Sequence, residues 1–207
     1  MRPIELNAIT DFLLACEVFF FAGRFFEFQK EPLSAAWWWN LSIIILAVTA
    51  LIGGIDHGFL DISNHPYRIC VTKVNWAFLG VLAFTIIMTI SQQYFSDLGQ
   101  TVLLVIGVVQ FVVYLIFLMH NDNFIFVSLN IAPVMIFLLV LVVLNFRIAP
   151  QSLDMIIGIL ILIVGSLVQG FKVSTFHPLD GNGLGHLIVM VAVVFLYRGG
   201  VILNTQA

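Results

Sequence analysis

Two short segments of this chain carry residue types that bind metal ions and activate water. The first, residues 53–59, reads GGIDHGF and includes His57, and the second, residues 177–186, reads HPLDGNGLGH and ends at His186. Two imidazoles and a third nitrogen or oxygen ligand make a zinc site that keeps one position open for water. Zinc lowers the pKa of that water to about 7, which gives a hydroxide for attack on a carbonyl. The two segments therefore predict a zinc site if the fold brings them together.

Each segment also carries an aspartate near its histidine. Asp56 directly precedes His57, and Asp180 lies one to two helical turns before His186. A carboxylate that accepts a hydrogen bond from the second ring nitrogen orients a metal-binding imidazole, and a carboxylate can also move protons during catalysis. We therefore expect Asp56 or Asp180 to orient a histidine or to transfer a proton. Asp180 or Asn182 is also suited to cap a helix that begins after it.

The elements that position these residues belong to a very apolar chain. Of its 207 residues, 61% are hydrophobic and 9% are charged, whereas soluble domains contain roughly 25% charged residues. The apolar runs have the length of about 20 residues that a helix needs to cross a bilayer, and period-two alternation is absent. We therefore predict an all-α integral membrane protein, a seven-transmembrane-helix bundle that forms a single domain over residues 1–207. The expected helices lie near residues 8–29, 36–60, 70–94, 98–119, 123–147, 152–174 and 184–205.

All five histidines fall on one side of this predicted bundle, the side that holds the N-terminus, which we name face A. They are His57, His65, His120, His177 and His186. In an antiparallel order of seven helices, the end of the second helix and the start of the seventh lie on the same side. His57 and His186 can therefore converge if these two helices are neighbours.

The basic residues, in contrast, are divided evenly between face A and the opposite side, face B. Those toward face A are Arg2, Arg68, Lys73 and Lys172, and those toward face B are Arg24, Lys30, Arg147 and Arg198. An excess of Lys and Arg marks the cytoplasmic side of a membrane protein. The even division therefore gives no orientation in the membrane.

Polar residues inside the expected spans also lie in the half nearer face A. They are Glu17, Gln110, Asn130, Ser166 and Gln169. They could line a polar funnel that opens at face A, because ionisable groups within a membrane usually face a cavity or a partner. They could equally form hydrogen bonds between helices. An ion pathway through Glu17 is a third reading, but the two-half repeat found in many transporters is absent.

Three segments carry a resemblance to a known superfamily, namely residues 53–59, residues 182–186 and the closing LYRG at 196–199. With the seven expected helices, they resemble the superfamily of alkaline ceramidases and progestin and adiponectin receptors, and the chain looks most like its bacterial relatives. The resemblance implies a zinc-dependent hydrolase that cuts an amide in a lipid, here in a bacterial inner membrane, with His57 and His186 as zinc ligands. The pattern of that superfamily adds a serine one turn before the first histidine, an aspartate on the third helix and an H-x-x-x-H pair opening the seventh.

This chain departs from the pattern at those three additional positions. Gly53 and Asn182 stand in place of the serine and of the first histidine of the pair, and no Asp or Glu occurs from residue 62 to residue 96. Because an amide is a poor zinc ligand beside imidazole, His177 in the loop is the candidate for the third ligand. The same departures favour a second hypothesis, since a fold can be inherited without its chemistry.

Two function hypotheses therefore stand side by side. The first is a zinc-dependent hydrolase that acts on a lipid amide or ester, with a membrane lipid as its substrate. The second is a non-catalytic seven-helix scaffold, receptor-like or an accessory subunit. A net charge of −3 with eight basic residues offers no surface for nucleic acid. The absence of lysine from residues 184–205 excludes a retinal Schiff base in the last helix.

Overall fold

A computed structural model describes residues 3–27, 31–146, 152–173 and 178–203 of the chain. Within these ranges the chain forms seven α-helices and one π-helical segment, and it contains no strand. The elements are α1 (Pro3–Phe25), α2 (Ala35–Ile55), η1 (Asp56–Asp61), α3 (Arg68–Tyr94), α4 (Asp97–His120), α5 (Ile125–Leu144), α6 (Leu153–Gly170) and α7 (Gly181–Ile202). The all-helical prediction and the number of helices are thereby confirmed.

The seven helices are long and apolar enough to cross a membrane, counting η1 as the continuation of α2. Where the expected boundaries fall on described residues, they agree with the observed ones to within about five residues, with the largest difference at the start of α1. The expected ends at residues 29, 147, 174 and 205 lie outside the described residues. Helix α7 begins earlier than expected because Asp180 is its N-cap. The Asp180 carboxylate accepts hydrogen bonds from the backbone N–H groups of Asn182 and Gly183, both at 3.0 Å, which satisfies two of the free donors at the helix start.

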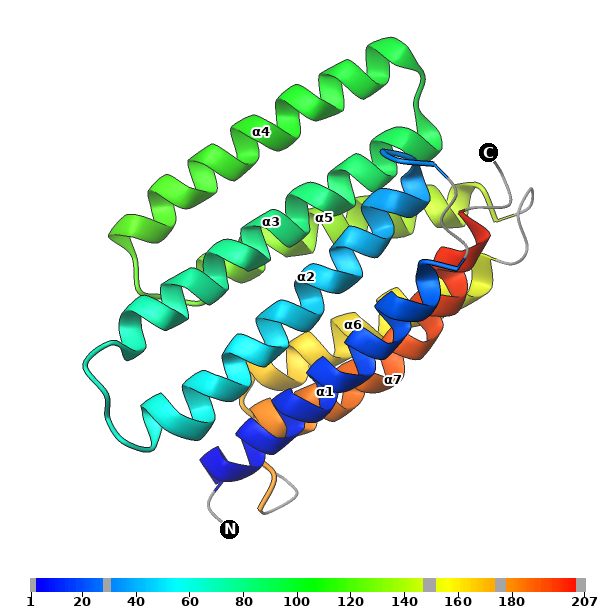
Figure 1. Cartoon of the computed structure of the whole chain (residues 1–207). Helices are drawn as coiled ribbons and strands as arrows, with labels where there is room; N and C mark the ends of the chain where they lie inside the picture. Colours follow the sequence, from blue (N-terminus) through cyan, green and yellow to red (C-terminus); the bar gives the residue numbers. More distant parts are fainter. Residues whose placement is uncertain (1–2, 28–30, 147–151, 174–177, 204–207) are drawn as a thin grey trace.

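The helices form a bundle whose members alternate in direction along the chain (Figure 1). Helix α1 packs against both α2 and α7, α6 packs against α7, and α3 contacts α2, α4 and α5. Helix α4 lies at the outer edge of the bundle (Figure 1). The neighbourhood of α1, α2 and α7 decides the site, because it brings the end of α2 and the start of α7 against one side of α1.

Small residues let the helix backbones approach closely at these contacts. At the α6–α7 contact, a Cβ added to Gly199 would lie 2.8 Å from the backbone N and Cα of Met155. At the α1–α2 contact, a Cβ added to Gly54 would lie 3.0 Å from the ring of Phe12, and one added to Gly53 would lie 3.2 Å from both carboxylate oxygens of Asp11. The glycines at the end of α2 therefore leave room for side chains of α1.

Candidate functional site

Three side chains from three different elements meet at the face A end of the bundle. Asp11 comes from α1, His57 from η1 and His186 from α7. One Asp11 carboxylate oxygen lies 3.3 Å from Nε2 of His186, and the other lies 4.0 Å from Nε2 of His57. We name this group the Asp11 cluster. It confirms that the end of α2 and the start of α7 converge, and it adds a carboxylate between the two histidines.

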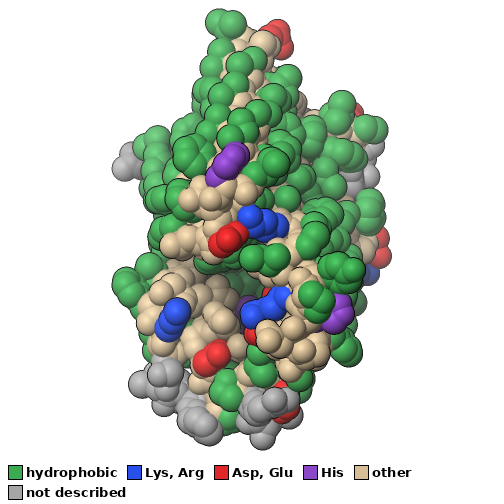
Figure 2. Space-filling model, turned by 90° about the vertical axis from the view of Figure 1, so that its left-hand side faces the viewer, with side chains coloured by type: hydrophobic (Ala, Val, Ile, Leu, Met, Phe, Trp, Pro, Cys, Tyr) green, Lys and Arg blue, Asp and Glu red, His purple; other side chains and the backbone are tan. Residues whose placement is uncertain are grey.

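The Asp11 cluster is buried on the Asp11 side and partly open on the His57 side. The Asp11 side chain is 6% exposed, that of His186 13% and that of His57 23%. Figure 2 looks onto the molecule from the side where face A lies in Figure 1 and shows a hollow near the centre of this end, with charged side chains of both signs around it. Through His57, the most exposed of its three side chains, the cluster is partly accessible.

The outer ring nitrogens of both histidines also face oxygen atoms. Nδ1 of His186 lies 3.0 Å from the hydroxyl of Thr10, which comes one residue before Asp11 on α1. Nδ1 of His57 lies 3.9 Å from a carboxylate oxygen of Asp61. Each imidazole thus turns Nε2 toward Asp11 and Nδ1 toward an outer oxygen. Metal-binding histidines have the same arrangement, with one nitrogen on the ion and the other on an oxygen of the protein.

The start of α3 holds the π-helical segment that carries His57. The Arg68 guanidinium lies 2.5 Å from one carboxylate oxygen of Asp61 and 3.5 Å from one of Asp56. The Thr72 hydroxyl donates to the other carboxylate oxygen of Asp56 at 3.2 Å. π-helical turns are rare and occur frequently at functional sites, and here two residues of α3 fix the turn next to the Asp11 cluster.

The remaining site residues expected from the sequence have other surroundings. Asp56 contacts Arg68 and Thr72 of α3, and Asp180 caps α7 and accepts a hydrogen bond from the Asn7 side-chain amide at 3.0 Å. In this structure Asp61 and Thr10, which the sequence did not single out, are the groups that face Nδ1 of the two imidazoles. His177 lies outside the described residues, so its place as a ligand stays a prediction.

The donor types of the Asp11 cluster fit a zinc ion. Two imidazole nitrogens and one carboxylate are a known ligand set for zinc, and the carboxylate oxygen nearer His57 is buried without a hydrogen-bond partner. Ligands of a tetrahedral zinc ion lie about 3.3 Å apart, so the distance of 3.3 Å from Asp11 to His186 matches, whereas the 4.0 Å to His57 is longer. As they stand, no three His, Cys, Asp or Glu side chains among the described residues are arranged to hold an ion.

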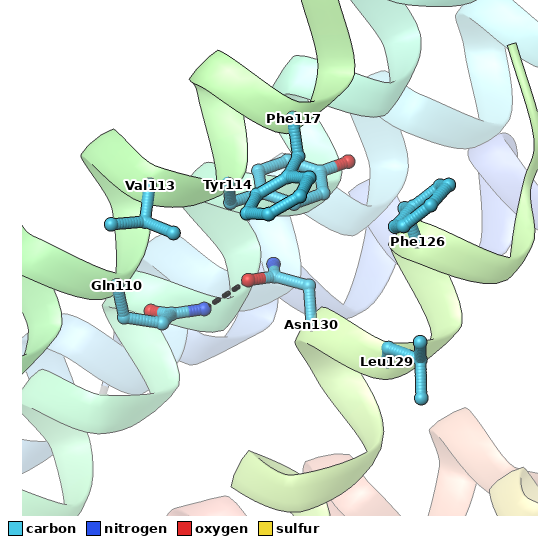
Figure 3. Close-up of a pocket in the computed structure, with 7 residues that line it drawn as sticks. All are labelled: Gln110, Val113, Tyr114, Phe117, Phe126, Leu129 and Asn130. Atoms are coloured by element: carbon cyan, nitrogen blue, oxygen red, sulfur yellow. Dashed lines mark hydrogen bonds between the residues drawn. The ribbon is translucent and has the colours of Figure 1, made fainter. Parts of the chain in front are cut away.

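A second polar feature lies away from the Asp11 cluster, between α4 and α5. The side-chain amide of Gln110 donates to the carbonyl oxygen of Asn130, beside a cavity lined further by Val113, Tyr114, Phe117, Phe126 and Leu129 (Figure 3). The other amide atoms of this pair, Gln110 Oε1 and Asn130 Nδ2, are buried without partners. The pair matches the expectation of a hydrogen bond between helices.

The fold and the site together define an all-helical bundle of seven helices with a histidine–carboxylate cluster at one end. Residues 6–205 match a family of unknown function, DUF6962, and the chain belongs to that family. No curated protein matches the chain. No solved structure matches it either.

Proposed function

We propose that this protein spans a membrane seven times, in a bacterial inner membrane, and that it is a metal-dependent hydrolase acting on a lipid amide or ester. One observation carries the proposal. Two histidines far apart in the sequence turn Nε2 toward the same buried carboxylate, that of Asp11. Ionisable residues within a membrane usually face one another or a cavity and mark a functional site.

His57 and His186 are the proposed zinc ligands, and His177 is a further candidate from the loop before α7. A zinc ion bound there would supply a hydroxide at neutral pH and would polarise a carbonyl. Thr10 holds the His186 imidazole through Nδ1 at 3.0 Å. Asp61 is the carboxylate that faces Nδ1 of His57, at 3.9 Å and without a hydrogen bond. Asp56 and Asp180 are proposed to position the ligands without contacting the metal. Asp56 fixes the π-helical turn through Arg68, and Asp180 fixes the start of α7.

The depth of the Asp11 cluster supports a lipid as the substrate. His186 lies five residues inside α7, which is about 8 Å from the start of the helix at 1.5 Å per residue. If α7 begins at the membrane surface, this depth is the boundary between headgroups and acyl chains, about 5–10 Å deep. The amide and ester bonds of membrane lipids lie at this boundary, so a lipid need not leave the membrane to reach the cluster.

Purified protein, supplied with zinc and then freed of excess metal, tests the proposal directly. We expect one zinc ion per chain and the release of fatty acid from vesicles that contain N-acylated or O-acylated lipids. His57→Ala and His186→Ala should each lower the zinc content and reduce fatty-acid release at least about 100-fold, because a lost ligand costs more than a lost outer partner. The matched control is His120→Ala, since His120 also ends a helix at face A but forms its hydrogen bond with the Ile116 carbonyl of its own helix. A zinc-free wild type with unchanged behaviour in both variants would refute the proposal.

A non-catalytic seven-helix scaffold, receptor-like or an accessory subunit, is the second candidate. The distance of 3.3 Å between Asp11 and His186 favours it, because the imidazole and the carboxyl group can pair with each other without a metal. In that case the histidine variants should lower the unfolding temperature, while no lipid in the panel is hydrolysed and no zinc is retained. Zinc retention that depends on both histidines would count against this candidate.

A further inference from the structure

We propose that Asp11 is a metal ligand of the cluster, completing a set of two histidines and one carboxylate with His57 and His186. The proposal rests on the metal site of the proposed function. Asp11 lies in the eleventh position of the chain, far from both histidines in sequence, and the superfamily pattern has no counterpart for it on the first helix. Asp11 is only 4% exposed, and one of its carboxylate oxygens faces Nε2 of His186 while the other faces Nε2 of His57.

Hydrogen bonding around Thr10 defines what His186 presents to Asp11. The Thr10 hydroxyl donates its single hydrogen to the Asn7 backbone carbonyl at 2.9 Å. The same oxygen lies 3.0 Å from Nδ1 of His186. If the hydroxyl hydrogen is directed at Asn7, this oxygen accepts and Nδ1 carries the proton. In a neutral imidazole, Nε2 then has a free lone pair directed at a carboxylate oxygen 3.3 Å away. An ionised Asp11 would then place two acceptors opposite each other, and either a metal ion or a proton between them satisfies both.

Gly53 supplies the space that the Asp11 carboxylate occupies. A Cβ at residue 53 would lie 3.2 Å from both carboxylate oxygens, closer than most real Cβ contacts. Where the superfamily pattern has a serine side chain, this chain has none, and a carboxylate from α1 lies against the gap. The absence of a side chain at residue 53 therefore leaves the space that the Asp11 carboxylate occupies.

The test measures binding of Co²⁺ as a probe of the zinc site, by titration of the purified protein and by the visible absorption of the bound ion. Asp11→Asn keeps the shape of the side chain but removes its charge. We expect it to weaken Co²⁺ binding by more than the 10–100-fold that the loss of an outer partner costs, and to change the visible spectrum. Asp122→Asn is the matched control, since Asp122 is a carboxylate at face A that pairs with Lys73 at 2.8 Å.

The outcomes separate this inference from the proposed function. If the wild type binds Co²⁺ through His57 and His186 while Asp11→Asn binds it equally well with the same spectrum, Asp11 is not a ligand and only the inference fails. If Asp11→Asn abolishes binding but the zinc-loaded wild type hydrolyses no lipid, the inference holds and the hydrolase proposal fails. A wild type that binds neither Co²⁺ nor zinc overturns both. Gly53→Ala serves as a second variant, because it keeps the carboxylate but crowds it, and it should also weaken Co²⁺ binding.

Discussion

At the scale of single residues, the Asp11 cluster depends on the groups that face Nδ1 of each imidazole, the ring nitrogen directed away from Asp11. An imidazole that binds a metal through one nitrogen is commonly fixed by a hydrogen bond from the other. For His186 that partner is Thr10, at 3.0 Å, and for His57 the nearest outer acceptor is Asp61, at 3.9 Å. The hold on His186 is therefore the tighter of the two, which makes Thr10 the residue to change.

We expect Thr10→Val, which keeps the shape of the side chain but removes the hydroxyl, to weaken Co²⁺ binding about 10–100-fold. It should also destabilise the fold by about 1–3 kcal/mol, because Nδ1 of the mostly buried His186 is left without an acceptor. Thr10→Ser keeps the hydroxyl and is the control. Equal Co²⁺ affinity in the valine variant and the wild type would show that Thr10 does not orient His186.

Part of this residue-scale arrangement could be read from the sequence. The convergence of His57 and His186 follows from helix order, because the end of α2 and the start of α7 share a face. Asp11 carried a signal as well, since an ionisable residue within a span suggests a functional site. Its partners could not be derived, because no local rule relates a residue of α1 to residues of η1 and α7.

At the scale of the elements, α6 packs closely against α7, the helix that carries His186 near its start. The glycines of this contact lie toward the other end of α7. Gly199 and Gly158 form this contact. A Cβ on Gly199 would meet the Met155 backbone at 2.8 Å, and one on Gly158 would meet the Leu196 backbone N at 2.9 Å. Backbone atoms cannot turn aside as a flexible side chain can, so a methyl group at either position must push the helices apart.

Gly199→Ala should therefore destabilise the bundle by about 1–3 kcal/mol through overpacking. This outweighs the gain of up to about 1 kcal/mol that alanine brings to a helix interior. Gly23→Ala is the matched control, since nothing lies within 4 Å of its added Cβ, and it should keep or raise the unfolding temperature. Thermal unfolding in detergent measures both variants. An unchanged or higher unfolding temperature for Gly199→Ala would contradict the close packing of α6 on α7.

At the scale of the whole molecule, the proposed membrane topology puts the Asp11 cluster on one side of the bilayer. Two native cysteines, both exposed in the structure, report on this. Cys70 lies in the first turn of α3 at face A, whereas Cys16 lies in the middle of α1 and is surrounded by exposed apolar side chains such as Leu13 and Phe20. Their reactivity should therefore differ in an intact membrane.

A membrane-impermeant maleimide should label Cys70 from one side of the membrane only, and it should reach Cys16 only after detergent dissolves the bilayer. Asp97→Cys in a Cys70→Ser background places a thiol at the opposite end, in the first turn of α4, and should be labelled from the other side. Labelling of residues 70 and 97 from the same side would contradict the proposal that α3, which separates them, crosses the membrane. The side that labels Cys70 is also the side from which the Asp11 cluster is reached.

The sequence by itself determined the helical class, the number of helices and the face that carries the histidines. These properties follow from hydropathy and from the polar, Gly and Pro residues that separate the apolar runs. Both are local features of the chain and can be read without knowing distant contacts. It also marked Gly53 and Asn182 as departures from the pattern of the superfamily that the chain resembles, and this resemblance stays a prediction. It could not say what occupies the space that those residues leave.

Only the tertiary structure decided which helices are neighbours and which polar groups meet. It placed α1 against both α2 and α7, which brought the Asp11 carboxylate between two imidazoles, and it paired Gln110 of α4 with Asn130 of α5. The physical reason is that helix packing depends on how side chains of facing helices fit together. The Asp11 carboxylate, for example, fits against α2 because Gly53 has no Cβ. Such contacts join distant parts of the chain and leave no periodic pattern in the sequence.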